Sequence, residues 1–425
     1  MRTVKFAKYL PECNWQPVIL TMQPSAHHPQ RLDPSLLEEV SPQLKVYRTP
    51  VWMLDRSLAK AKKRVLGLFS MAAKESISTV ETAAGGERRQ RPAALDHIRD
   101  WLQFPDDYGG WLLPALWRGY QVMKSERIDL IYSTAPSPVT HMIALILKRW
   151  ARCPWVADFR DPWECLFPES VYLEGRHPWR QQAEVAMAEK VVRAADLVIA
   201  NTPRLRTAFR GRFPGLAAGK FVTIPNGFDP EDFRRLPPGT SGTGKFTIAH
   251  TGTFFTTLRS PDEVLRAIQD LVNDGKINPA ILCVKLVGCG TYTGPSAPYL
   301  QVVPRVSHDE SLRIVAQSDV LLLLQQSAKY LLQVPAKTYE YIAARKWILA
   351  VTPEGATRDI VANLPNGVVV TPDKPEELKS AILKLYRMYL EGQLYPVPWD
   401  HDDLNRFSRR QQTHILSSYF DRLVR

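Results

Sequence analysis

The chain has 425 residues, of which 45% are hydrophobic and 10% aromatic. This length suits two domains of roughly 200 residues each, and the hydrophobic content excludes a wholly disordered protein. The five cysteines are scattered, odd in number and without a CxxC pair. This pattern argues against a disulfide framework and a zinc site, and it is typical of a reducing compartment.

Basic residues outnumber acidic ones by 55 to 43, which gives a formal net charge of +12. Such a surplus suits nucleic acid, an anionic membrane surface or a phosphorylated substrate. Nucleic acid ranks last, because the sequence has no zinc finger, aromatic–basic RNA motif or compact basic recognition helix. No stretch reaches the roughly 18 apolar residues of a membrane span, and the first residues lack the apolar core of a signal peptide. We therefore expect a cytoplasmic protein.

The first half of the chain opens with a helix pattern and continues with strands and helices in alternation. The predicted elements up to the middle of the chain are a helix over 2–10, strands over 17–22, 44–48 and 129–134, a helix over 141–150, a strand within 154–163, a helix over 183–194 and a strand within 196–203. Thr202 is placed to cap the next helix, with Pro203 at its first position. Asn226-Gly227 is typical of a tight turn.

Residues 56–74 mix Lys and Arg with Leu, Val, Phe and Met at roughly helical spacing. Such a segment can lie on an anionic membrane, with its basic face on the head groups. On that interpretation the protein is peripheral on the inner face of the plasma membrane. The alternative is an ordinary amphipathic helix that covers the core. Residues 82–92 are rich in Gly and Arg and predict a loop.

The second half repeats the strand–helix alternation more clearly. The predicted strands lie within 246–253, 284–290, 300–306, 318–325, 347–351 and 367–371, and the predicted helices begin at 260–263 or cover 309–317, 336–345, 375–390 and 406–424. Alternation in both halves predicts two doubly wound α/β domains with a ligand cleft between them. We place the domains at 1–235 and 246–402, with a linker over 236–245 and a final helical segment over 403–425.

The stretch from Gln333 to Gly355 predicts a loop, a helix, a buried strand and a loop. Pro335 suits the first helical position. Lys337 and Glu340 share one helix face near the N-terminus, where a phosphate can be bound. Glu340 can also accept hydrogen bonds from a pair of sugar hydroxyls, so the stretch indicates half of a nucleotide-sugar site. The alternative is an exposed Lys–Glu pair on an ordinary helix.

Four motifs together resemble the family 4-like glycosyltransferases of the GT-B fold. They are PWVADFRDPW (154–163), IPNGFDPEDF (224–233), GTFFTTLRSP (252–261) and VPAKTYEYIAARKWILAV (334–351). The likeness covers nearly the whole chain in the right order, and is strongest to bacterial enzymes that build lipopolysaccharide, capsule or exopolysaccharide. It implies that the second domain holds a nucleotide-sugar, that the first presents the acceptor, and that the final helix crosses back to the first domain.

The resemblance also assigns donor-binding residues. Glu340 matches the glutamate that binds the ribose hydroxyls, and Gly252 matches the glycine that lets the backbone approach the diphosphate. Family members often place an arginine and a lysine where this chain has Thr253 and Arg259. Thr253 therefore lacks the positive charge of the arginine, and Lys337, near the same helix end, is placed to supply a charge for the diphosphate instead.

Two further positions follow from the same resemblance. Val306 matches a position where backbone groups meet the base. His308 next to it is expected to be structural or capping, because it precedes Asp309 at a helix start.

Three departures from the family pattern limit the assignment. Leu332 stands where a second glutamate often touches the donor sugar, so the sugar stays open. Arg345 and Trp347 replace the usual glycine and proline, and because Arg adopts the left-handed conformation less readily than Gly, we expect a different turn. The chain also opens in a helix instead of a strand and Gly-rich loop, so we expect either a start upstream of Met1 or an impaired product.

The resemblance implies a metal-independent transfer that retains configuration, with no cofactor. Arg259 and Lys337 would meet the charge of the leaving diphosphate. Asp158, Arg160 and Asp161 end a predicted strand, where they can orient the acceptor or form a structural ion pair that braces the following turn. His141 and Arg204 suit helix packing and surface roles. Two alternatives remain, a nucleotide-sugar 2-epimerase of the same fold and a non-catalytic, N-terminally truncated relative.

Overall fold

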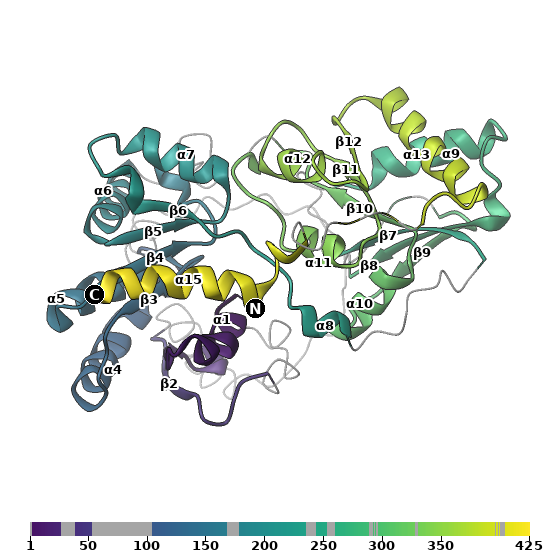
Figure 1. Cartoon of the computed structure of the whole chain (residues 1–425). Coiled ribbons are helices and arrows are strands. Elements are labelled where there is room, and N and C mark those ends of the chain that lie inside the picture. Colours follow the sequence, from purple (N-terminus) through teal and green to yellow (C-terminus); the bar gives the residue numbers. More distant parts are fainter. Residues whose placement is uncertain are drawn as a thin grey trace, which may run out of the picture.

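The computed structural model describes most of the chain as two α/β halves joined end to end (Figure 1). The described residues are 2–26, 39–52, 104–167, 178–234, 244–252, 260–288, 292, 294, 296–327, 330–395, 397, 399 and 404–425. The predicted membrane-binding segment 56–74 and most of the predicted linker lie outside them. Within these residues no helix is both long enough and apolar enough to cross a membrane.

A four-stranded parallel sheet forms the centre of the N-terminal half, in the order β3-β4-β5-β6. Its elements are β3 (Ile131–Thr134), α5 (Pro138–Ala151), β4 (Trp155–Phe159), α6 (Pro178–Ala194), β5 (Leu197–Ala200), α7 (Pro203–Arg212) and β6 (Phe221–Thr223). Strands β4 and β5 are buried along their whole length, as central strands of a parallel sheet must be. Thr202 caps α7 as predicted, because its hydroxyl accepts a hydrogen bond from the Leu205 N–H.

The beginning of the chain forms a second, smaller unit. Helix α1 (Arg2–Tyr9) precedes a parallel pair, β1 (Val18–Met22) and β2 (Lys45–Thr49), which α4 (Leu112–Ser125) covers. In the described part of the chain β1 and β3 each have a hydrogen-bonded neighbour on one side only. The strands of this half are therefore divided between two sheets. The hydrophobic periodicity of the sequence did not indicate this division.

The C-terminal half contains a six-stranded parallel sheet in the order β12-β11-β10-β7-β8-β9. Its elements are β7 (Phe246–Thr251), α9 (Asp262–Asn273), β8 (Leu282–Val287), β9 (Leu300–Val303), α10 (His308–Gln317), β10 (Val320–Leu324), α11 (Lys337–Ala343), β11 (Trp347–Val351), α12 (Ala356–Val361), β12 (Gly367–Val370) and α13 (Pro375–Leu390). Neighbours β7 and β10 are not consecutive, so the strand order reverses between them. Ligands of doubly wound sheets bind at such a point, outside the carboxyl ends of the strands.

The last helix, α15 (Arg409–Val424), lies along the N-terminal half beside α1 (Figure 1). Leu416 and Phe420 pack in one buried cluster with Phe6 and Leu10. The helix therefore crosses back to the first half of the chain, as the resemblance implied.

Asn226-Gly227 is not the tight turn that the sequence suggested. The segment runs extended into α8 (Pro230–Arg234), and the Phe228 N–H donates to the Phe407 carbonyl. A Cβ on Gly227 would lie 2.2 Å from the Phe407 oxygen. Glycine is needed here because the two chain segments approach closely, not because the chain reverses direction.

The start and end of α11 both differ from expectation. The helix begins at Lys337, so Pro335 precedes it, and the Pro335 carbonyl accepts from the Thr338 N–H in a preliminary turn. Arg345 adopts the left-handed conformation, with φ 55°. The expected change of turn is therefore wrong, because the arginine takes up the conformation that glycine would adopt at lower cost.

Candidate nucleotide-sugar site

Gly252 follows β7 directly, next to the reversal of strand order in the C-terminal sheet. Its N–H donates to the Val287 carbonyl, and its φ of 111° is one that residues with a side chain rarely adopt. A Cβ at this position would lie 2.7 Å from the ammonium of Lys337. Because Gly252 has no side chain, the ammonium of Lys337, which comes from α11, can lie against the backbone at the end of β7.

His250 holds that ammonium in place. Its Nδ1 lies 2.9 Å from the Leu322 carbonyl, and its Nε2 lies 3.1 Å from Lys337 Nζ. A carbonyl can only accept, so Nδ1 carries the proton and Nε2 accepts from Lys337. The sequence did not indicate this role, because His250 lies in a buried strand and its partner is distant in the chain.

Tyr341 fixes α11 against the end of β7. Its hydroxyl accepts a hydrogen bond of 3.0 Å from the Thr251 N–H, and its side chain is buried. Because Lys337 and Glu340 lie on the same short helix, four residues and one residue before Tyr341, this bond sets their position relative to Gly252. Tyr341 is thus a positioning residue.

The Glu340 side chain is half-buried beside this group. Among the described residues its carboxylate has no hydrogen-bond or ion-pair partner. Burial raises the pKa of the carboxyl, and the charges of His308 and Lys337 offset this rise only in part. A partly buried acceptor that has no partner among the described residues is suited to bind hydroxyl donors from a ligand.

The other predicted donor-binding positions are less informative. Thr253 and Arg259 lie outside the described residues. Val306 is half-buried against the core between β9 and α10. Gly288, at the end of β8, would place a Cβ 3.9 Å from Cα of Gly252, so the carboxyl ends of these neighbouring strands meet at one place.

Leu332 faces the N-terminal half instead of the donor residues. Its side chain packs against that half's core, and its carbonyl accepts a 2.8 Å hydrogen bond from the Thr202 hydroxyl. Arg204, in the helix α7 that Thr202 caps, pairs with Asp359, with Nη2 2.7 Å from Oδ1. Arg204 is therefore at the surface, as expected, and it joins the two halves.

Asp158 forms the structural ion pair that the sequence left open, but with an unexpected partner. Its Oδ2 lies 2.7 Å from Arg2 Nε, and both side chains are buried. Tyr132 and Thr134 also donate to this carboxylate. The pair joins β4 to α1 and does not brace the Pro162-Trp163 turn. A carboxylate with these partners has little capacity left for an acceptor.

Arg160 and Asp161 follow β4 and are partly exposed, with Arg160 Nε 3.9 Å from Asp161 Oδ2. Partial burial raises the pKa of Asp161, and Arg160 counteracts this rise. Unlike Asp158, these two side chains are accessible at the carboxyl edge of the N-terminal sheet.

His141 packs between helix and sheet, as expected. Its ring lies 4.7 Å from that of Phe159, and its Nδ1 is 2.8 Å from the Ser133 hydroxyl. Burial lowers its pKa to about 4, so the ring is neutral at physiological pH.

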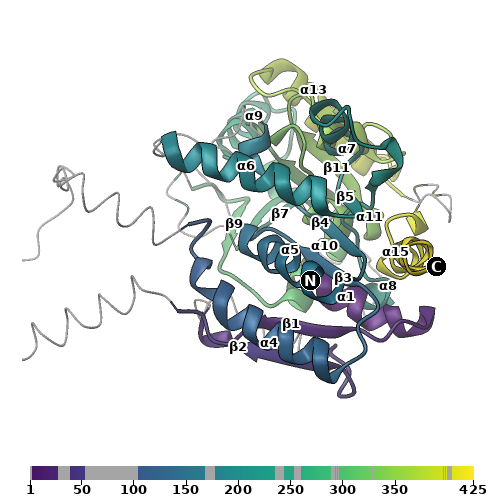
Figure 2. The same ribbon diagram turned by 90° about the vertical axis from the view of Figure 1, so that its left-hand side faces the viewer.

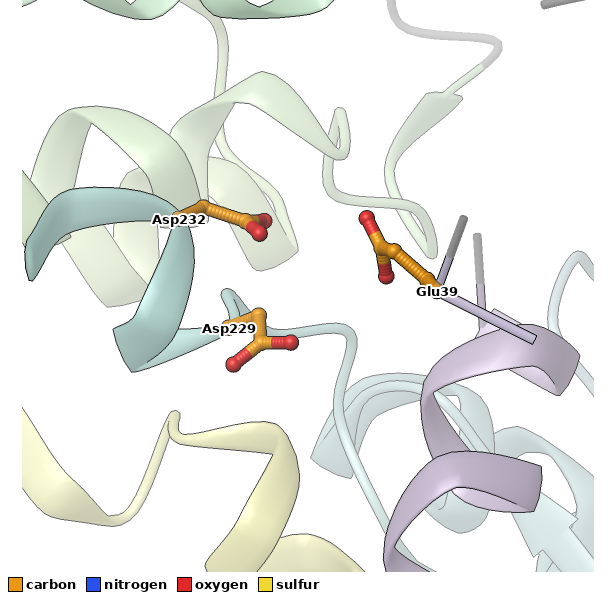
Figure 3. Close-up of side chains that lie close together, drawn as sticks. All are labelled: Glu39, Asp229 and Asp232. Atoms are coloured by element: carbon orange, nitrogen blue, oxygen red, sulfur yellow. The ribbon is translucent and has the colours of Figure 1, made fainter. Parts of the chain in front are cut away.

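Three carboxylates, from Glu39, Asp229 and Asp232, face a common point between α1 and α8 (Figure 3). They are the one group in the described part of the chain with the geometry of a metal site. The ammonium of Lys5 lies 2.5 Å from Glu39 and 2.9 Å from each aspartate, and that of Lys8 lies 2.9 Å from Asp229, so the two lysines offset part of the negative charge of the group. This partly buried cluster connects the first helix to the segment that leads into the C-terminal half.

His308 contacts the same cluster. His308 is the first residue of α10, and the N-terminus of that helix is capped by Ser307. Of the two roles expected for His308, the structure therefore shows the structural one and not the capping one. Its Nε2 lies 3.7 Å from Asp232, which raises the pKa of the imidazole.

Comparison with known proteins agrees with this architecture. Residues 77–232 match the family described as Glycosyltransferase Family 4. A comparison with proteins of curated function gives no match.

Three solved structures share the overall fold over almost the whole chain. HepE from Anabaena, in complex with UDP and glucose, has a TM-score of 0.59 at 15% identity and covers 99% of this chain and 95% of its own. Sucrose-phosphate synthase from Thermosynechococcus elongatus has a TM-score of 0.60 at 13% identity, with coverages of 99% and 92%. A glycosyltransferase from Rickettsia africae has a TM-score of 0.54 at 12% identity, with coverages of 100% and 94%.

Proposed function

We propose that the chain is a family 4-like glycosyltransferase of the GT-B type, which the family match over residues 77–232 and the shared fold support. On this proposal it transfers a sugar from a nucleotide-diphosphate sugar to a lipid-linked or polysaccharide acceptor. The single observation that carries the proposal is the convergence of Gly252, Lys337 and Glu340 at the strand-order reversal of the C-terminal sheet.

Each of the three residues supplies one element of donor binding. Gly252 allows close approach of a diphosphate to the backbone, and Lys337 supplies positive charge 2.7 Å from where a Cβ would stand. Glu340 accepts hydrogen bonds from the ribose hydroxyls. HepE, which shares the fold, has been solved with UDP-glucose, and this supports a nucleotide-sugar as donor here.

The transfer step in this proposal is metal-independent and retains configuration. Charge that develops on the leaving diphosphate is stabilised by Lys337 and Arg259. Arg160 and Asp161 orient the acceptor from the opposite sheet edge, whereas Asp158 holds Arg2 in place. The product would serve cell-envelope polysaccharide synthesis at the inner face of the plasma membrane, with residues 56–74 as one candidate contact.

A transfer assay on the full chain tests the proposal. UDP-, GDP- and dTDP-linked sugars are incubated with and without octyl glycosides, and the sugar protons are followed by NMR. We expect nucleoside diphosphate release and a new glycosidic signal only with acceptor, with the donor's anomeric configuration. Isomerisation of the sugar without acceptor would identify the epimerase instead. Failure of every donor to bind would contradict the proposal.

A further inference from the structure

The outer face of α4 carries a stripe of exposed side chains, three hydrophobic and one basic. Leu113, Trp117, Tyr120 and Lys124 follow each other at spacings of four, three and four residues, so they share one side of the helix. Leu113 is 62% exposed and Trp117 69% exposed. The opposite side, with Ala115, Leu116 and Val122, packs against β1, β2 and α5. The stripe is therefore not part of the core of this half.

Two further tryptophans extend the stripe at its ends. The Trp150 ring, at the end of α5, meets the Tyr120 ring edge-on at 5.7 Å, and it is exposed. The backbone N–H of Trp52 donates to the Gly110 carbonyl, just before α4, and the Trp52 side chain is exposed as well. We call Trp52, Leu113, Trp117, Tyr120 and Trp150 the aromatic face. It contains every Trp among the described large hydrophobic residues that are exposed.

The surroundings of the aromatic face are basic. Neither α4 nor α5 contains an acidic residue. Lys124, Arg149 and Arg152 are exposed near it, whereas the exposed Arg127 is paired with Asp129, with Nε 3.2 Å from Oδ1. The nearby acid Glu126 is neutralised by Lys45, whose Nζ lies 2.8 Å away.

Tryptophan and tyrosine with a lysine and arginine rim are the residues that favour the interface of an anionic bilayer, because their rings are amphipathic and their charges attract lipid phosphates. A protein partner of ordinary composition would meet an unbalanced positive rim here. We propose that the aromatic face docks the protein on an anionic membrane surface.

The position of this face fits a membrane-borne acceptor. Trp111, at the start of α4, donates from its indole to the Thr49 hydroxyl at the carboxyl end of β2. The helix therefore begins at the edge where parallel strands present ligands and runs away from it. Figure 2 shows α4 at the front, over β1 and β2, with α5 above it. Docking by this side would bring the carboxyl edge of the N-terminal half close to the bilayer.

Vesicle co-sedimentation of the full chain tests this docking. The vesicles are an equal mixture of phosphatidylglycerol and phosphatidylcholine, with pure phosphatidylcholine for comparison. Leu113→Glu/Trp117→Glu should lower binding to the anionic vesicles at least tenfold. The matched control Leu390→Glu/Val424→Glu, which changes two exposed residues with the same change in charge, should stay within about twofold of wild type.

A second pair of double variants measures the electrostatic contribution to vesicle binding. Lys124→Gln/Arg149→Gln should weaken binding about fivefold per cation, whereas Lys276→Gln/Arg313→Gln should not. Binding should also fall as salt rises. Melting temperatures of all variants are measured first, and Trp117→Ser replaces the double variant if that variant unfolds.

Three results would overturn the proposal. One is equal vesicle binding by the aromatic-face variant and its matched control. Another is binding that disappears only when the basic residues of 56–74 are substituted. The third is conversion of a dimer to a monomer by Leu113→Glu/Trp117→Glu without loss of vesicle binding, which would assign the face to a second copy of the chain.

Discussion

Replacement of Glu340 by glutamine tests the assigned ribose contact most closely. The substitution keeps the shape of the side chain but removes its charge. A hydrogen bond to a charged group contributes about 1.5–3 kcal/mol, and an amide keeps only one accepting oxygen of the two. We expect a loss of about 1.5–3 kcal/mol of donor binding, or about 10- to 150-fold in Kd.

The same substitution should have the opposite effect on stability. Burial raises the pKa of Glu340, so the folded protein holds that proton more tightly than the unfolded chain does. The ionised carboxylate therefore costs stability at pH values above its folded-state pKa. Without donor, Glu340→Gln should melt above wild type at pH 7, and the difference should vanish as the pH falls through the folded-state pKa to acidic values.

Calorimetric titration with nucleotide-sugars and thermal melts between pH 4 and 8 measure both effects. Donor binding by wild type should weaken as the pH falls, starting at a higher pH than for an ordinary glutamate, whereas binding by the variant should change little. Glu391→Gln, at an exposed position after α13, is the matched control and should change neither quantity. A variant that binds donor like wild type, or that melts lower at pH 7, would refute this interpretation of Glu340.

Three further substitutions test other parts of the structure. Gly252→Ala forces a side chain into a φ of 111° and against Lys337, so donor affinity measured by titration should fall at least about tenfold, whereas Gly211→Ala, in open space, should not lower it. Arg345→Gly removes a left-handed penalty of about 1–2 kcal/mol at an exposed site, which the entropy of glycine offsets in part, and thermal melts should show a gain of about 0.5–1 kcal/mol. Lys5→Met removes the ammonium that Glu39, Asp229 and Asp232 share and leaves Asp229 with Lys8 alone, so chemical denaturation at pH 7 should show a loss of about 3–5 kcal/mol; a loss below about 1 kcal/mol would contradict this view.

The parallel strands could be predicted from the sequence because each is a short apolar run between turn residues. Val320–Leu324 is the clearest case, and it is buried throughout. Helix α4 was missed because its exposed Leu113 and Trp117 hide the amphipathic pattern that marks a surface helix. The division of the N-terminal strands into two sheets is a matter of pairing between distant segments, which local periodicity does not encode.

The site was predicted where function rests on residues close together in the chain. Lys337 and Glu340 are three residues apart on α11, and the structure brings Gly252 to the same place. The partners of the predicted residues are distant instead. Asp158 pairs with Arg2 from the first helix, and Lys337 meets His250 from the central strand β7, 87 residues earlier in the chain. No spacing rule within a motif could have identified these contacts.

Binding of nucleoside diphosphates to the full chain tests the central claim most directly. Melting curves are recorded with UDP, GDP and dTDP for wild type and for Gly252→Ala/Glu340→Ala. For one of these ligands at 100 times its Kd, the folded wild type should gain about 2.7 kcal/mol and melt at a higher temperature, and the double variant should lose most of that gain. No shift with any diphosphate in a folded wild-type protein, or an equal shift in the variant, would contradict the claim that this sheet edge holds the donor.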